Sequence, residues 1–90
     1  MKAEDTNADD PEMVALDALI WLLHDERRAA RLLDVTGLTP DGLRAGVGDH
    51  ATLAAVMTFL EGHEPDLLAC AEGMDVKPDV LVAAARALEQ

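Results

Sequence analysis

The sequence predicts an all-α fold, a single compact bundle of about six short helices. Each of the four prolines is followed at once by an acidic residue, as in Pro40-Asp41 and Pro78-Asp79, and opens an apolar stretch with helical spacing. Proline is tolerated at the first position of a helix, and an acid there meets the positive end of the helix dipole. No segment shows the alternating pattern of a strand. We therefore expect a disordered acidic tail over residues 1–9 and one helical domain over residues 10–90.

The first two expected helices span residues 11–24 and 26–36. Asp10 and Asp25 precede them, and aspartate is a good N-cap because its carboxylate accepts free backbone N–H groups. The first helix is apolar around most of its circumference, which is typical of a central helix contacted on several sides. The second ends at Gly37, since glycine readily adopts the left-handed conformation found after a helix C-terminus.

The third and fourth expected helices span residues 40–47 and 50–60, the latter after Asp49 as N-cap. In the third, Leu43 and Val47 are expected to face inward. The residues of the fourth that are expected to face the core are Leu53, Val56, Met57 and Leu60.

The fifth and sixth expected helices span residues 64–73 and 78–88. Their apolar residues again recur every three or four positions, which predicts one buried face for each. The residues expected to face the core are Leu67, Leu68 and Ala71 in the fifth helix, and Val80, Leu81, Ala84 and Leu88 in the sixth.

The two halves of the chain have a similar pattern of residues at an offset of 38 residues, the separation of Pro40 and Pro78. Under this shift the only two aromatic residues, Trp21 and Phe59, coincide, and so do the expected boundaries between helices. A pseudo-repeat of a three-helix unit explains this pattern. The alternative is simply two similarly spaced runs of short helices.

The chain is strongly acidic, with a formal net charge of −11 from 7 basic and 18 acidic residues. Direct binding to nucleic acid needs clustered lysine and arginine, so we expect none. No lysine or arginine lies between Arg44 and Lys77. This segment is either a solvated surface or a docking face for a basic partner. The candidate residues of that acidic face are Asp49, Glu61, Glu64, Asp66, Glu72 and Asp75.

The only basic island consists of Arg27, Arg28 and Arg31, with Arg44 nearby in sequence. Guanidinium groups bind phosphate and carboxylate through paired hydrogen bonds, so these four residues form a candidate anion-binding site. Scattered surface ion pairs are the simpler explanation.

The sequence offers no set of residues for catalysis, and we expect neither an enzyme nor a bound cofactor or metal. Serine is absent, there is no glycine-rich phosphate loop, and no two histidines stand three or four residues apart. Cys70 lies in an apolar run, where a thiol usually behaves as a small buried hydrophobe. The longest unbroken apolar run, Ala18 to Leu23, is too short to cross a bilayer. With no secretion signal at the N-terminus, the expected location is the cytoplasm.

Three segments carry a resemblance to a known family: Ala15 to Leu22, Thr36 to Arg44, and Glu64-Pro65-Asp66-Leu67-Leu68. Together with Val56-Met57-Thr58-Phe59-Leu60 and the last helix, they resemble an uncharacterised bacterial family catalogued as domain of unknown function 3572. The resemblance covers roughly residues 11 to 89. It implies a small, acidic, helical protein and gives no catalytic residues. Cys70 departs from the family, whose members often have an aromatic residue there.

These observations favour a non-enzymatic interaction protein that acts through a helical surface on another protein or on a second copy of itself. A core of aliphatic residues with many alanines buries little area per residue, which makes a homodimer reasonable. Two alternatives stay open. The acidic face could imitate the phosphates of nucleic acid and inhibit a basic partner, or the arginine island could bind a small anion.

Overall fold

The computed structural model describes residues 10–89, and within them the chain forms six helices and no strand. The predicted all-α fold is therefore confirmed. The helices are α2 (Pro11–Leu23), α3 (Glu26–Thr36), α4 (Pro40–Ala45), α5 (His50–Glu61), α6 (Glu64–Met74) and α7 (Pro78–Leu88). The prediction of a disordered tail over residues 1–9 lies outside the described residues.

Side-chain caps begin four of the six helices. The side chains of Asp10, Asp25, Thr39 and Asp49 accept backbone N–H groups of the first turns of α2, α3, α4 and α5. The hydrogen bonds from the backbone N–H groups of Arg28 and Arg27 lower the pKa of the Asp25 carboxyl below its ordinary value. A proline stands in the first turn of α2, α4, α6 and α7, as the sequence predicts.

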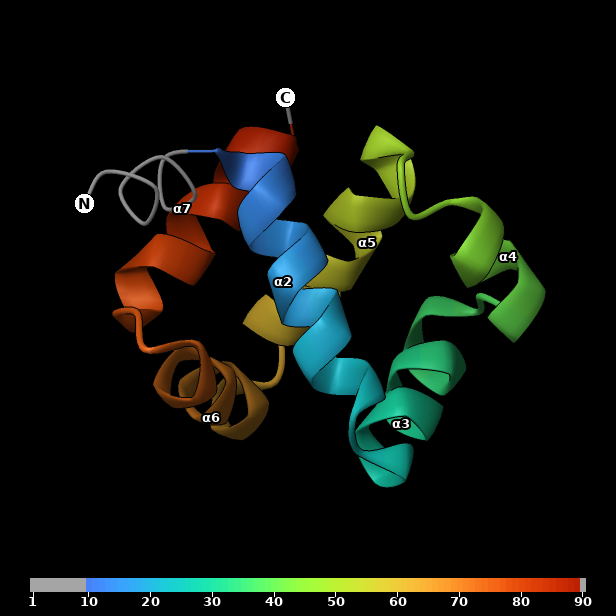
Figure 1. The fold of residues 1–90 in the computed structure, drawn as a ribbon, viewed down its shortest axis with the longest axis horizontal. Helices are drawn as coiled ribbons and strands as arrows, with labels where there is room; N and C mark the ends of the chain where they lie inside the picture. Colours follow the sequence, from blue (N-terminus) through green and yellow to red (C-terminus); the bar gives the residue numbers. More distant parts are fainter. Residues whose placement is uncertain (1–9, 90) are drawn as a thin grey trace.

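The helix α2 is central, because it packs against α3, α5, α6 and α7. It crosses α5 near the middle of the molecule, with α3 and α4 on one side and α6 and α7 on the other (Figure 1). Large side chains from these helices and their neighbours are almost fully buried and form the core around this crossing. They include Leu19, Leu22, Leu32, Met57, Leu60 and Leu81.

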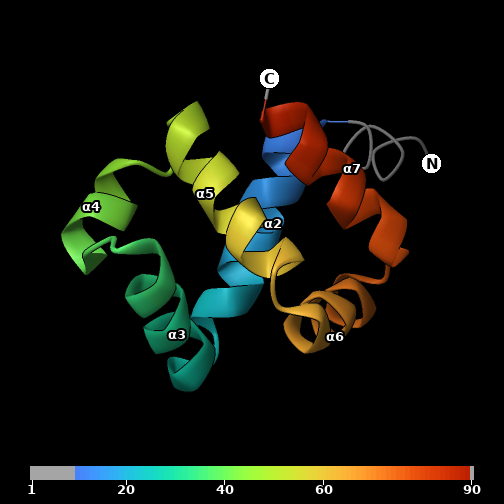
Figure 2. The same cartoon turned by 180° about the vertical axis from the view of Figure 1, so that it is seen from behind.

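The two halves of the described chain are related by an approximate twofold axis. Turning the molecule by 180° brings α5, α6 and α7 to the positions that α2, α3 and α4 occupied (Figures 1 and 2). A shift of 38 residues converts the bounds of α3 into those of α6, and the start of α4 into that of α7. The two described residues with positive φ, Gly37 at 79° and Asp75 at 60°, are also 38 apart. The structure therefore favours the pseudo-repeat over chance spacing.

The repeat is imperfect in its third helix. The helix α4 has 6 residues, whereas α7 has 11 and packs against both α2 and α5. Because α4 ends at Ala45, Val47 lies in the following turn and is 41% exposed, so its predicted inward position is wrong.

The predicted inward position of Leu68 is also wrong, because this side chain is 47% exposed. The face of α6 that meets the core carries Leu67, Cys70 and Ala71. Leu68 follows Leu67 by about 100° around the helix and so falls outside that face.

Candidate functional site

The outer side of α2 carries large apolar side chains that no other helix covers. Met13 is 37% exposed, Ile20 48% and Leu23 46%, and Leu16 between them is partly buried. These four residues recur at intervals of three or four, so they lie along one face of the helix. We call Met13, Leu16, Ile20 and Leu23 the α2 face. The sequence predicted a central helix with neighbours on several sides, and this outer side is the part that has none among the described residues.

The equivalent positions on α5 show that folding does not require large apolar residues there. Under the 38-residue shift the α2 face corresponds to Ala51, Ala54, Thr58 and Glu61. Ala51 and Thr58 are exposed and Ala54 is partly buried, like their counterparts in α2. Two helices in equivalent environments thus carry opposite kinds of outer surface. The large apolar residues are particular to α2, which makes the α2 face the leading candidate site.

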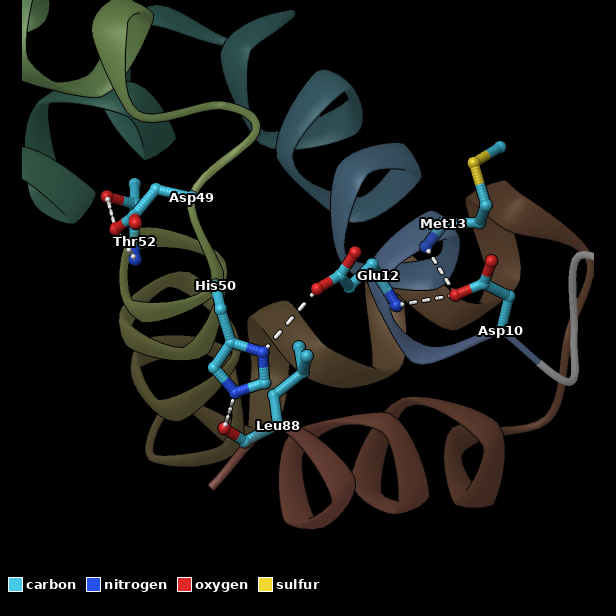
Figure 3. A network of polar contacts seen from close by, with 7 residues as sticks. All are labelled: Asp10, Glu12, Met13, Asp49, His50, Thr52 and Leu88. Atoms are coloured by element: carbon cyan, nitrogen blue, oxygen red, sulfur yellow. Dashed lines mark hydrogen bonds and ion pairs between the residues drawn. The ribbon is translucent and has the colours of Figure 1, made fainter. Parts of the chain in front are cut away.

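Acidic residues border the α2 face. Helical geometry places Glu12 on one side of it and Asp17 on the other. The carboxylate of Glu12 lies 3.5 Å from Nδ1 of His50, while Nε2 of His50 lies 2.6 Å from the carbonyl oxygen of Leu88 (Figure 3). Since Nε2 donates to that carbonyl, Nδ1 bears a proton only in the charged imidazolium, and only then do His50 and Glu12 form an ion pair. His50 thereby joins the ends of α2, α5 and α7.

A second surface feature is a pocket of about 330 Å³ between α3 and the C-terminal half of α5. The rings of Phe59 and His63 stack in its wall, with centroids 4.5 Å apart. Its lining residues are Val35, Thr36, Ala55, Thr58, Phe59, Gly62 and His63. No single motif in the sequence signals this pocket, because its residues come from two helices that meet only in the folded chain.

Three of the four arginine residues predicted to bind an anion have separate partners. The guanidinium of Arg28 lies over the Trp21 ring, 3.9 Å from its centroid, and Arg31 forms an ion pair with Asp66 of α6. Arg44 pairs with Asp41 of its own helix at 3.3 Å, and both side chains are exposed. Arg27 is exposed at the first turn of α3. The four side chains therefore do not converge on one point.

The six acidic residues predicted to form a docking face are spread over α5 and α6. Asp49 caps the start of α5, about 18 Å from the end of that helix at 1.5 Å per residue. Glu61 and Asp66 are already paired, with Arg86 at 3.0 Å and with Arg31, respectively. The remaining three, Glu64, Glu72 and Asp75, are exposed around α6. The six residues thus extend over both helices, and two of them are paired with arginine.

The seam between α2 and α6 is closely packed around Trp21. A Cβ atom added to Gly73 of α6 would collide with Nε1 of the Trp21 indole and lie 2.9 Å from its Cδ1. Cys70 is fully buried beside this seam, and burial raises the pKa of its thiol to about 12. The nearby Arg28 opposes this rise and Asp66 adds to it. The thiol is therefore protonated at neutral pH, as expected of a core residue.

Two of the three histidines contact the backbone of the helix that precedes them. His24 and His63 each direct Nδ1 at a backbone carbonyl four residues earlier, at 2.8 and 3.1 Å. Within residues 10–89, no three histidine, cysteine, aspartate or glutamate side chains lie close enough to hold a metal ion. In that same part of the chain, no helix has the length and apolar character needed to cross a membrane.

The model of one protein family, described as Protein of unknown function (DUF3572), matches residues 8–90. The match covers nearly the whole chain and includes the α2 face and both halves of the pseudo-repeat. Neither a curated protein nor a solved structure matches the chain.

Proposed function

The chain belongs to the DUF3572 family, and we propose that it is a non-enzymatic protein-interaction module that binds its partner through the α2 face. The observation that carries the proposal is the contrast between Ile20 and Leu23, which are about half exposed, and the small or polar residues at the equivalent positions of α5. Exposed apolar side chains that lie together usually mark an interaction site.

The occupant that fits the α2 face is an amphipathic helix of another protein, with basic residues beside its apolar side. A helix laid against another helix engages residues at spacings of three and four, which is the spacing of Met13, Leu16, Ile20 and Leu23. Glu12 and Asp17 border this face, and the chain has a net charge of −11. A second copy would bring the same negative charge, so charge complementarity favours a basic partner over a homodimer.

The two alternative functions gain less support from the geometry. An imitation of nucleic acid needs a dense array of free carboxylates, and here Glu61 and Asp66 are each paired with an arginine. An anion site at the arginine island needs converging guanidinium groups, and those of Arg28, Arg31 and Arg44 each have another partner. We place the interaction module in a bacterial cytoplasm, where a lone thiol such as Cys70 stays reduced.

Affinity capture with matched variants tests the proposal. The double variant Ile20→Glu/Leu23→Glu puts two carboxylates on the α2 face, and Ala51→Glu puts one at the equivalent exposed place on α5. All three forms should unfold at similar temperatures, because the substituted side chains are exposed. Partners captured from host lysate by the wild type at about 500 mM salt should be lost with the double variant and kept with Ala51→Glu.

The salt series separates the three functions. An apolar interface keeps its partner at high salt, whereas an acidic imitation of nucleic acid releases a basic partner as salt rises. Sedimentation of the purified protein identifies self-association directly. If the double variant captured the same proteins as the wild type, the α2 face would not be the binding surface.

A further inference from the structure

We propose that the pocket between α3 and α5 binds a tryptophan side chain of a protein partner. This second binding site lies apart from the α2 face, because α2 and α5 form opposite sides of the molecule (Figures 1 and 2). The inference therefore does not depend on the function proposed for the α2 face. It rests on the internal symmetry of the chain, on the chemistry of the pocket walls and on its size.

The symmetry indicates what fits the pocket. Shifted by 38 residues, the pocket residues Val35 and Phe59 correspond to Gly73 and Trp21. In the α2–α6 seam the indole of Trp21 lies directly against the Gly73 backbone. In the α3–α5 seam the smaller Phe59 is 3% exposed, and beside it lies the pocket of about 330 Å³. One seam is thus filled by an indole from within the chain, and its counterpart is open.

The walls of the pocket suit an aromatic ring. Phe59 and His63 present stacked rings, against which a further ring can lie in an offset or edge-on geometry. Val35 of α3 also lines the pocket and is 55% exposed. An aromatic side chain placed between them would cover Val35 and extend the stack.

The pocket also offers acceptors for the indole N–H. Nδ1 of His63 lies 3.1 Å from the carbonyl oxygen of Phe59 and must donate to it. In the neutral imidazole this leaves Nε2 as an acceptor. The hydroxyl of Thr58, which is exposed, is a second polar group in the lining. An indole has one N–H donor and otherwise apolar surface, and this matches a pocket with few polar atoms.

The same features argue for a side chain and against a larger or charged ligand. The volume is at the lower end of the range of about 300–1,000 Å³ found for small-molecule sites. No lysine, arginine, aspartate or glutamate lines the pocket, so it has no permanently charged group to pair with a phosphate or a carboxylate. Tryptophan is also enriched among the residues that dominate protein interfaces.

Nuclear magnetic resonance titrations of the full chain test the inference. The probes are N-acetyltryptophanamide, which carries the side chain between two peptide groups, and free indole, with N-acetylleucinamide as the control. We expect saturable shifts at Val35, Thr58 and His63 with N-acetyltryptophanamide, at a dissociation constant on the order of 1 mM, as suits so small a ligand. Contacts between the indole protons and the Val35 methyl groups should appear in nuclear Overhauser spectra.

Two variants locate the site. Val35→Trp places an indole at the rim of the pocket and should weaken the binding of N-acetyltryptophanamide by about tenfold or more. Val47→Trp, at a similarly exposed valine on a turn, should leave that binding unchanged. The variant Ile20→Glu/Leu23→Glu should bind the probe normally, which separates this site from the α2 face. The absence of saturable shifts, or shifts confined to residues outside the pocket, would overturn the inference. Binding of free indole alone would also overturn it, by pointing to a small molecule.

Discussion

Cys70 shows how one buried side chain sets a chemical property of the protein. Its thiol is fully buried, and burial raises its pKa to about 12. The thiolate is the form that attacks thiol reagents, so Cys70 in the native protein should react far more slowly than a free cysteine at about pH 8. Addition of denaturant should restore the ordinary rate. The time course of a chromogenic disulfide reagent measures both rates, and fast labelling of the folded protein would contradict the buried thiol.

The same pKa gives Cys70 a pH-dependent effect on stability. In the unfolded chain the thiol loses its proton at about pH 8.5, whereas in the folded chain it keeps the proton up to about pH 12. Between these values the unfolded state binds fewer protons, so the free energy of unfolding falls as the pH rises. Relative to Cys70→Ala, which has no thiol, the wild type should therefore lose melting temperature above about pH 8.5. Parallel melting curves for the two proteins would argue against this linkage.

The contact between α2 and α6 leaves no room for a side chain at Gly73. Replacing glycine by alanine inside a helix usually stabilises it by about 1 kcal/mol. At Gly73 the new methyl group would collide with the Trp21 indole, whose ring is also covered by the Arg28 guanidinium. Gly73 is exposed and Trp21 is only partly buried, so the indole can shift in part. Gly73→Ala should therefore destabilise the protein by about 1 kcal/mol, at the lower end of the range for overpacked sites. Chemical denaturation measures the change.

The double variant Trp21→Phe/Gly73→Ala provides the control for that prediction. It replaces the indole by the smaller ring found at the equivalent position of the other half, Phe59. If the collision is the cause, the effect of Gly73→Ala should be smaller in the Trp21→Phe background than in the wild type, as contacting residues are expected to couple. If Gly73→Ala lowered the stability equally in both backgrounds, the loss would come from α6 itself and not from the contact with position 21.

The helices themselves could be predicted from sequence because their signals are local. Asp10, Asp25 and Asp49 cap helices at the predicted places, and Gly37 adopts the predicted left-handed conformation. The positions of Val47 and Leu68 could not be predicted as well, because they depend on where a helix ends or which neighbour it meets. The pairing of Arg31 with Asp66 joins residues 35 positions apart in the chain, for which a single sequence carries no signal.

The sequence predicted the central position of α2 but not its uncovered side. An unusually apolar first helix predicts a central position, and α2 is central. The sequence could not say that one side would stay uncovered, because this depends on the number and length of the surrounding helices. Comparison with α5 shows that folding does not require a large apolar residue on this side, since Thr58 stands where α2 has Ile20.

The pseudo-twofold arrangement makes each half of the chain depend on the other. The helix α2 packs against α5, α6 and α7 of the second half, and α3 packs against α5. Isolated helices shorter than about 12–15 residues are marginal in water, and separation would expose the apolar side chains that each half buries against the other. We therefore expect a fragment of residues 10–48 and a fragment of residues 49–90 each to be largely unfolded alone. When mixed, they should assemble and recover the native helix content.

The division after Gly48 is favourable because that residue is exposed in the turn before α5, with open space around it. Circular dichroism of the separate fragments and of their mixture measures the gain in helix content. A second fragment carrying Leu60→Asp provides the control, because Leu60 is fully buried at the crossing with α2 and a carboxylate there would prevent docking. A mixture whose spectrum equals the sum of its parts, or a fragment that is already helical alone, would show that the halves fold independently. If the wild-type fragments assemble and the pair with Leu60→Asp does not, the crossing of α2 and α5 is what makes the two three-helix units one domain.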